Sequence, residues 1–328
     1  MIEVEHLCKT FTVSRRDAGI RQAVSALFRR ETEKIRALDD VSFRIEAGEM
    51  VGYIGPNGAG KSSTIKVMSG ILTPDSGICR INGLVPWKQR REHVSRIGVV
   101  FGQRSQLWWD IPVIDSFMLL RDIYRTPDAV FRKNLSQLTE MLSLQEILRT
   151  PARQLSLGQR MRCEIAASLL HEPAVLFLDE PTIGLDAASK LAVRDFICQL
   201  NREKGTTIIL TTHDMQDIEA LAGRIILIGK GKILMDGDIE DFRRQLSPVR
   251  TVTVSTRKFA DITLPDGVQL VQKQGESGGR MVFTTDTEKV PVPQLIGMLS
   301  EKLEMYDLSV ENISMDALVL SLYKKYQI

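Results

Sequence analysis

A glycine-rich stretch near the start of the chain has the residue types of a phosphate-binding loop. Its members, in order, are Gly55, Pro56, Asn57, Gly58, Ala59, Gly60, Lys61 and Ser62. The stretch follows the apolar run 50–54 and precedes a predicted helix over 63–68, an order in which backbone N–H groups and a helix N-terminus surround phosphate oxygens. Lys61 can neutralise the β- and γ-phosphates, and the Ser62 hydroxyl can occupy a Mg²⁺ coordination position. The stretch therefore predicts binding of a nucleoside triphosphate.

Two acids follow a second apolar run. Residues 174–178 predict a buried strand, and Asp179 and Glu180 stand directly after it. A strand that delivers an acid at its carboxyl end is the Walker B arrangement, in which Asp179 holds the Mg²⁺ shell. The next acid, Glu180, is placed to polarise an attacking water as a general base. A strand that merely enters a turn would look the same, but a phosphate loop in the same domain favours the metal site.

Three further polar groups stand at strand ends or at a helix start. His213 follows the predicted strand 206–210 at the edge where ligands bind in open α/β sheets, which favours a γ-phosphate contact over a structural role. Gln103 follows the predicted strand 97–101 and can reach Mg²⁺ or the attacking water. Ser156 opens a predicted helix and suits an N-cap, although an exposed helix start with Ser and Gly is also an anion site.

The elements that position these groups alternate between strands and helices. This alternation predicts an α/β domain with a parallel sheet covered on both faces, and further strands are predicted over 1–13 and 38–45. From 104 to about 173 the pattern is helical. We therefore expect a helical insertion in the α/β domain.

The pattern changes near residue 247. Beyond it, strands are predicted over 251–255, 267–273, 280–285 and 308–313, and helices over 294–303 and 315–326. These elements predict a second, small α+β domain over 247–328, after an α/β domain over 1–246.

The composition argues against several kinds of partner and site. The chain has 43 Lys and Arg against 41 Asp and Glu, a formal net charge of +2, so its bulk charge requires neither nucleic acid nor an anionic membrane. The cysteines are scattered without metal-binding spacing and predict free thiols in a reducing cytoplasm. No run approaches the roughly 18 apolar residues of a membrane span, and the N-terminus lacks a signal-peptide pattern. We expect a soluble chain whose membrane role depends on a partner.

A basic segment over 14–36 carries apolar residues at helical spacing, namely Ile20, Val24, Leu27 and Phe28. A short basic amphipathic helix can lie on an anionic membrane or against a membrane protein. It can also pack on its own domain with a solvated basic face, and we favour this second interpretation.

Taken together, the motifs resemble those of an ABC transporter ATPase, over residues 1 to about 246. The shared set, in the family's order and spacing, is the phosphate loop, Gln103, Ser156-Leu157-Gly158-Gln159, Asp179-Glu180, Gly184-Leu185-Asp186 and His213. Leu157 stands where the family's signature, LSGGQ, has its first glycine. The resemblance implies a P-loop NTPase fold and a head-to-tail dimer with two ATP molecules between the subunits.

The resemblance also implies roles for single residues. Phe11 matches the aromatic that stacks on adenine, although a core role would suit it too, and Asp186 matches a residue that supports communication between the two sites. Nucleotide contacts are expected from Phe11, Gly55, Pro56, Asn57, Gly58, Ala59, Gly60, Lys61, Ser62, Ser63, Ser156, Gly158, Gln159 and Asp186. With ATP and Mg²⁺ as cofactors, metal contacts are expected from Ser62, Gln103 and Asp179, and catalytic roles from Glu180, His213 and Gln103.

Residues 247–328 resemble the accessory domain of bacterial export-type ABC ATPases, which serve drug, polysaccharide and sodium exporters. The expected function is the ATP-hydrolysing subunit of an exporter, peripheral on the cytoplasmic face of the inner membrane. Its partners would be permease subunits, docked on the insertion, and a second copy or a paralogue, with no nucleic acid. Trp108 and Trp109 suit either the permease surface or packing inside the insertion. An importer ATPase is the nearest alternative; a soluble ABC ATPase acting on ribosomes or DNA is less favoured, because the chain has one phosphate loop and no sustained heptads.

Overall fold

The computed structural model of the chain describes residues 1–14, 32–102, 104–241, 249–275, 277–312, 319, 322, 323 and 326. The chain divides into two compact units, Met1–Asp236 and Gly237–Gln327. The apolar positions of the predicted basic helix, and most of the predicted helix 315–326, lie outside the described residues. So does the predicted domain boundary near 246, which stays a prediction.

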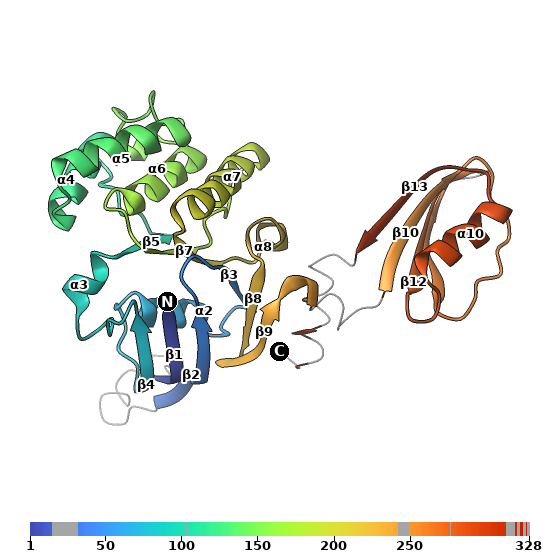
Figure 1. Ribbon diagram of the computed structural model, residues 1–328, viewed down its shortest axis with the longest axis horizontal. Helices are drawn as coiled ribbons and strands as arrows, with labels where there is room; N and C mark the ends of the chain where they lie inside the picture. The colour runs from blue at the N-terminus through green and yellow to red at the C-terminus, as the bar shows by residue number, and fades with distance from the viewer. Residues whose placement is uncertain are drawn as a thin grey trace, which may run out of the picture. The chain divides into compact units, whose positions relative to one another are not determined.

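A six-stranded sheet carries the elements around the predicted phosphate loop (Figure 1). Its strand order is β5 (Ile97–Phe101), β6 (Val175–Asp179), β7 (Thr207–Thr211), β3 (Met50–Ile54), β8 (Arg224–Gly229) and β9 (Lys232–Asp238). The pairs from β5 to β8 are parallel. β6 and β7 are almost entirely buried, as their continuous apolar runs predict. The predicted α/β fold is confirmed, although the sequence analysis does not identify β8 and β9.

Another three strands form a separate antiparallel sheet, in the order β2 (Thr32–Ile45), β1 (Ile2–Ser14) and β4 (Ser76–Ile81). The end of the basic segment, from residue 32, is therefore strand and not helix. In the last part of β2, buried and exposed residues alternate, which is typical of antiparallel sheets with one face on a core. The sequence predicts strands here but does not separate them from the parallel sheet.

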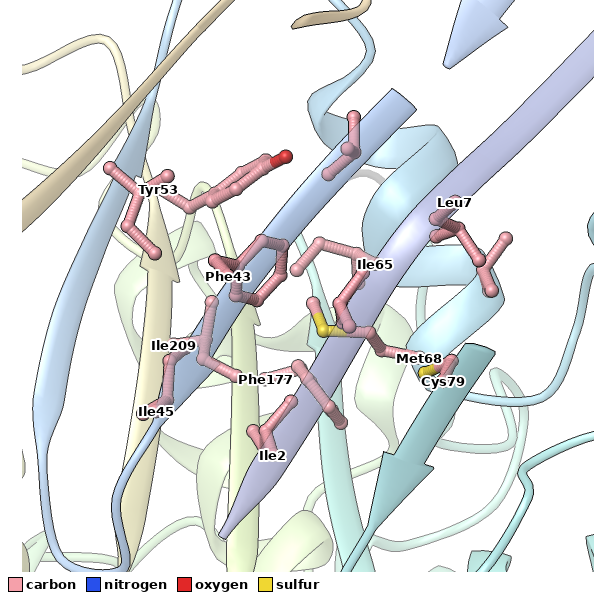
Figure 2. Packing of buried hydrophobic residues seen from close by; sticks show 14 of the residues in the cluster. Ile2, Leu7, Phe43, Ile45, Tyr53, Ile65, Met68, Cys79, Phe177 and Ile209 are labelled. Carbon is pink, nitrogen blue, oxygen red and sulfur yellow. The ribbon is translucent and has the colours of Figure 1, made fainter. Parts of the chain in front are cut away.

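A large apolar cluster joins the two sheets to helix α2 (Lys61–Met68), as Figure 2 shows. Phe43 of β2 lies 5.7 Å from Tyr53 of β3 between ring centroids, and both pack in one cluster with Ile65 of α2. The Tyr53 hydroxyl is 3.0 Å from Oγ1 of Thr64. Since β3 and α2 flank the phosphate loop, this packing holds both of its ends.

Helices form several of the connections between the strands of the first unit. Those between β5 and β6 are α4 (Val113–Tyr124), α5 (Asp128–Met141), the 3₁₀ helix η1 (Ala152–Gln154) and α6 (Leu157–Leu169), and the others are α3 (Arg90–Val94), α7 (Ala187–Lys204) and α8 (Met215–Leu221). α6 packs against α4, α5, α7 and β5. The stretch 104–173 thus contains helices, as predicted.

The second unit is an antiparallel sheet with one described helix of regular length. The strand order is β11 (Val268–Gln274), β12 (Gly279–Asp286), β10 (Val249–Thr256) and β13 (Met305–Asn312), and α10 covers Val292–Lys302. Phe283 of β12 and Val254 of β10 share a core with Leu295 and Leu299 of α10. This arrangement agrees with the predicted α+β class.

Candidate functional site

The loop between β3 and α2 is shaped by two glycines. A methyl group added at Gly55 would lie 2.1 Å from the carbonyl oxygen of Ile228 in β8, too close for any side chain. Gly60 has a φ of 114°, which glycine alone adopts readily. Lys61 then begins α2, and its Nζ donates to the carbonyl oxygens of Gly55 (2.5 Å) and Pro56 (3.1 Å). The loop that is predicted to bind phosphate therefore also holds the ammonium group.

A cavity of about 430 Å³ opens beside this loop, at the carboxyl ends of β5 and β6. The predicted site residues that line it are Asn57, Gly58, Gly60, Lys61, Ser62, Ser63, Asp179 and Glu180. Gly55, Pro56 and Ala59 belong to the loop without lining the cavity. Within one chain, the fold thus brings the phosphate loop and both acids together.

Asp179 lies at the end of β6, opposite Thr211 at the end of β7. The Thr211 hydroxyl donates a hydrogen bond to the Asp179 carboxylate. Burial raises the pKa of Asp179, which that hydrogen bond and Lys61 oppose. Burial also lowers the pKa of Lys61, which Glu180 and Asp179 oppose. Both charges are therefore partly desolvated and would gain from ligands of opposite charge.

The donor groups of the cavity suit Mg²⁺. The Asp179 carboxylate and the Ser62 hydroxyl offer hard oxygen ligands at one cavity. In the described part of the chain, no group of three or more His, Cys, Asp or Glu side chains could hold a metal. Mg²⁺ typically binds one or two carboxylates together with substrate phosphates and water. Asp179 and Ser62 would supply the protein's oxygen ligands to such an ion.

Glu180 is held in an uncommon conformation at the cavity. Its φ is 56°, in the left-handed region that non-glycine residues seldom adopt, and its N–H donates to the carbonyl oxygen of Thr211 (2.8 Å). Such strain persists where surrounding structure enforces it and often marks a functional site. Nδ1 of His213 lies 3.2 Å from Oε1 of Glu180. The exposed imidazole can thus orient a carboxylate that water can reach.

The predicted signature segment lies outside this cavity. Ser156 caps α6: its Oγ accepts from the N–H of Gln159 (3.2 Å), whose Oε1 accepts from the N–H of Ser156 (2.9 Å). Gly158 is buried against α7, where an added methyl group would lie 2.6 Å from Oγ of Ser189. Asp186 caps α7 and accepts from the N–H of Ser189 (2.9 Å). The polar groups at the starts of α6 and α7 are therefore hydrogen-bonded within the chain.

One other predicted contact, Phe11, does not line the cavity, and Gln103 cannot be placed. Phe11, in β1, is 36% exposed and is not among the residues lining the cavity. Gln103 lies outside the described residues. Its neighbour Gly102 lines the cavity and donates its N–H to the carbonyl oxygen of Asp179 (2.8 Å). The chain thus passes beside the Walker B acid immediately before position 103.

Three polar side chains at the site are absent from the sequence-based prediction. Lys66 and Arg104 line the cavity as additional cations, and Thr211 bonds Asp179. Lys66 could have been found, because it follows Ser62 by one helical turn and shares its helix face. Thr211 requires the strand order to be known, and no local pattern identifies Arg104.

Comparisons with known proteins agree with this geometry. A family model described as ABC transporter matches residues 38–183. The chain is 32% identical over 216 residues to the ABC transporter ATP-binding protein NatA of Bacillus subtilis (strain 168), covering 66% of this chain and 87% of that protein. It is 30% identical over 301 residues to the doxorubicin resistance ATP-binding protein DrrA of Mycobacterium tuberculosis, covering 88% and 89%. A solved dimeric ATP-binding cassette, in a post-hydrolysis state with ADP and Pi, matches with a TM-score of 0.60 and 25% identity, over 73% of this chain and 99% of that chain.

Proposed function

Because the chain belongs to the family of ABC transporter ATP-binding subunits, we propose that it hydrolyses ATP to power an exporter. The observation that carries the proposal is that one cavity is lined by Lys61, Ser62, Asp179 and Glu180 together. These are the groups that phosphoryl transfer needs: a cation and backbone donors for the phosphates, oxygen ligands for a metal, and a base.

In the proposed reaction, Glu180 accepts the proton of the attacking water. Its carboxylate lines the cavity that also contains Lys61. His213, 3.2 Å away from that carboxylate, orients it and contacts the γ-phosphate. Lys61 and the loop N–H groups stabilise the charge that develops on the transferred phosphoryl group, which is where most of the catalysis arises.

Metal binding in this proposal involves three residues. Asp179 and Ser62, both at the cavity, hold Mg²⁺ together with the nucleotide, and Gln103 adds a contact to the ion or to the attacking water. When bound, the ion neutralises negative charge on the β- and γ-phosphates. Gly102, which precedes Gln103 in the chain, lines the cavity and donates its N–H to the carbonyl oxygen of Asp179.

The second half of each ATP site comes from another chain in this proposal. Ser156, Gly158 and Gln159 are not among the residues lining the cavity of their own chain, and a similar cassette is a dimer with ADP and Pi bound. We place these three residues against the phosphate loop of a second copy or a paralogue. Asp186, at the start of the adjacent α7, would then relay the state of one site to the other.

A mixing experiment tests the shared site. Lys61→Ala disables the phosphate loop, and Ser156→Arg puts a bulky cation on the exposed start of α6. Each variant alone should hydrolyse almost no ATP, because every ATP site in its homodimer contains one substituted residue. Mixed, the two variants form dimers with one intact site, so activity should return. If the mixture stays inactive although both variants fold, the shared site is wrong.

The membrane contact is assigned to a permease. No helix in the described ranges has the length and apolarity to cross a membrane. A cleft of about 890 Å³ lies between α3 and the end of α4, and its lining includes Arg90, Arg91, Glu92 and Arg125 together with Ile123 and Tyr124. Glu92 pairs with Arg96, and within the described part of the chain no ion pair joins an acid to the three arginines of the cleft. The cleft therefore suits an acidic segment of the permease, at the cytoplasmic face of the inner membrane.

Co-expression with the permease encoded by a neighbouring gene tests this contact. Arg90→Glu combined with Arg91→Glu should abolish co-purification and leave ATP hydrolysis by the isolated chain unchanged. Trp108 and Trp109, which are 41% and 50% exposed on the insertion, provide further contact area. Undiminished co-purification of the double variant would contradict the assignment of the cleft.

Export is favoured over import by one similarity. The relative named for doxorubicin resistance matches 88% of this chain, well beyond the ATPase unit. We therefore propose a drug-like cargo moved outward, with import as the second candidate. Lower cellular accumulation of a cationic dye when the chain and its permease are expressed would support export, and a requirement for an extracellular binding protein would support import.

A further inference from the structure

A buried carboxylate in α6 has no part in the proposed reaction. Glu164 is only 5% exposed, and its carboxylate accepts hydrogen bonds from the Ser105 hydroxyl and from the N–H of Gln106 (3.1 Å). The Gln106 side chain also donates to the carbonyl oxygen of Glu164 (2.9 Å). Burial raises the pKa of Glu164, and these donors to the carboxylate oppose the rise. Since a buried charge is costly unless donors surround it, the carboxylate holds these two residues at a defined place on α6.

A second contact joins the same two segments. The guanidinium of Arg160, in the first turn of α6, lies 5.6 Å from the ring centroid of Trp109, a cation–π distance. Arg160 also donates its N–H to the carbonyl oxygen of Ser156 (2.9 Å). Because Arg160 and Glu164 are four positions apart, they share one face of the helix. The segment 104–109 therefore contacts α6 at two successive turns.

The same segment begins at the ATP cavity. Phe101, Gly102 and Arg104 line that cavity of about 430 Å³, and they also line a smaller cavity of about 140 Å³ whose walls include Arg160 and Glu164. The chain thus leads from the phosphate-binding region directly to the helix that carries the signature. Figure 1 shows α6 among the other helices of the insertion.

We propose that Glu164 is a positioning residue that makes the 104–109 segment and the start of α6 move as one body. This inference rests on the proposed function: ATP in the cavity of a chain sets where that chain presents Ser156 and Gln159 to its partner. The carboxylate suits the task because each of its two oxygens accepts from a different group of the segment. An amide in its place has only one oxygen, so one of these bonds is lost or, at the Ser105 hydroxyl, reversed in direction, and the negative charge that the donors surround is removed.

The experiment uses Trp109 of the full-length chain as a reporter. Of the three tryptophans, Trp87 and Trp108 are replaced by Phe, and the emission of Trp109 then follows the position of Arg160 over its ring. Because ring and guanidinium belong to one body, we expect ATP with Mg²⁺ to leave this emission unchanged in the parent chain. Glu164→Gln should uncouple the two segments, so that ATP with Mg²⁺ now changes the emission, while ATP binding measured by calorimetry stays at the parent level. As a matched control, Glu140→Gln on the exposed side of α5 should behave as the parent chain does.

Ser105→Ala provides a second test that leaves α6 intact and decides the matter if Glu164→Gln does not fold. It removes one donor and should let ATP produce part of the emission change seen with Glu164→Gln. Two results would overturn the inference and leave the proposed function standing: a parent chain in which ATP binding changes the Trp109 emission, or variants that bind ATP with no change in emission. A parent chain that fails to bind ATP would refute the proposed function and this inference with it.

Discussion

The proposed ATP site has two halves: a loop half, residues 55–62 and 179–180, and a signature half, residues 156–159. They differ in whether their polar groups already have partners within one chain. In the loop half, burial lowers the pKa of Lys61 and raises that of Asp179, so both charges gain from a ligand. In the signature half, the capping groups satisfy each other. The comparison indicates that the charges of the loop half require a ligand, whereas the capping groups of the signature half are already hydrogen-bonded within the chain.

The largest effect is expected in the loop half. Glu180→Gln keeps the shape of the side chain but cannot accept a proton, so kcat for ATP hydrolysis should fall by about 10²–10⁴-fold. ATP binding should persist, and dimers should accumulate with ATP trapped between them. Single-turnover hydrolysis and size-exclusion chromatography with ATP measure the two outcomes. Glu140→Gln is the control, and near-normal hydrolysis by Glu180→Gln would remove Glu180 from the role of base.

A smaller effect is expected from crowding the signature half. In Gly158→Ala the new methyl group would lie 2.6 Å from Oγ of Ser189, which is itself held by Asp186 (2.8 Å). Overpacking of this kind costs about 1–3 kcal/mol, and the shifted start of α6 should weaken ATP-dependent dimerisation. Thermal unfolding and dimer formation are the measurements. Gly223→Ala, with open space around the added methyl group, should change neither.

Removal of the α6 cap should have a still milder effect on folding. Ser156→Ala loses the hydrogen bond to the N–H of Gln159, which costs about 1 kcal/mol of stability. ATP affinity of the isolated chain should be unchanged, because Ser156 is not among the residues lining the cavity, while ATP-dependent dimerisation weakens. Ser300→Ala in α10 is a serine control. A drop in ATP affinity at concentrations where the chain is monomeric would contradict the division into halves.

The smallest effect is expected at Phe11. If this ring stacks on adenine, Phe11→Ala should raise KM for ATP by at most about 10-fold, since such aromatic contacts contribute about 0.5–1.5 kcal/mol. Stability should change little, because the ring is 36% exposed. Val13→Ala, two residues along the same strand and 46% exposed, is the matched control. Equal KM values for the two variants would make adenine stacking by Phe11 wrong.

Much of the fold could be predicted because local patterns report local structure. Residues 97–101 are both the predicted and the observed strand β5, since a strand buried on both faces must be apolar throughout. The helix after the phosphate loop was equally clear, although it begins at Lys61, two residues before its predicted start. Helix ends depend on single hydrogen bonds, so a pattern places them only approximately.

The sequence by itself determined the phosphate loop, the Walker B acids and the class of the fold, because these depend on residues adjacent in the chain. Only the tertiary structure decided that Arg104 and Lys66 share the cavity with Asp179, that Glu164 holds Ser105, and that the N-terminal strands form a sheet of their own. These features depend on strand order and on contacts between distant segments. A sequence pattern predicts which face of a helix or strand is buried. It does not predict which other element packs against that face, because that depends on the tertiary structure.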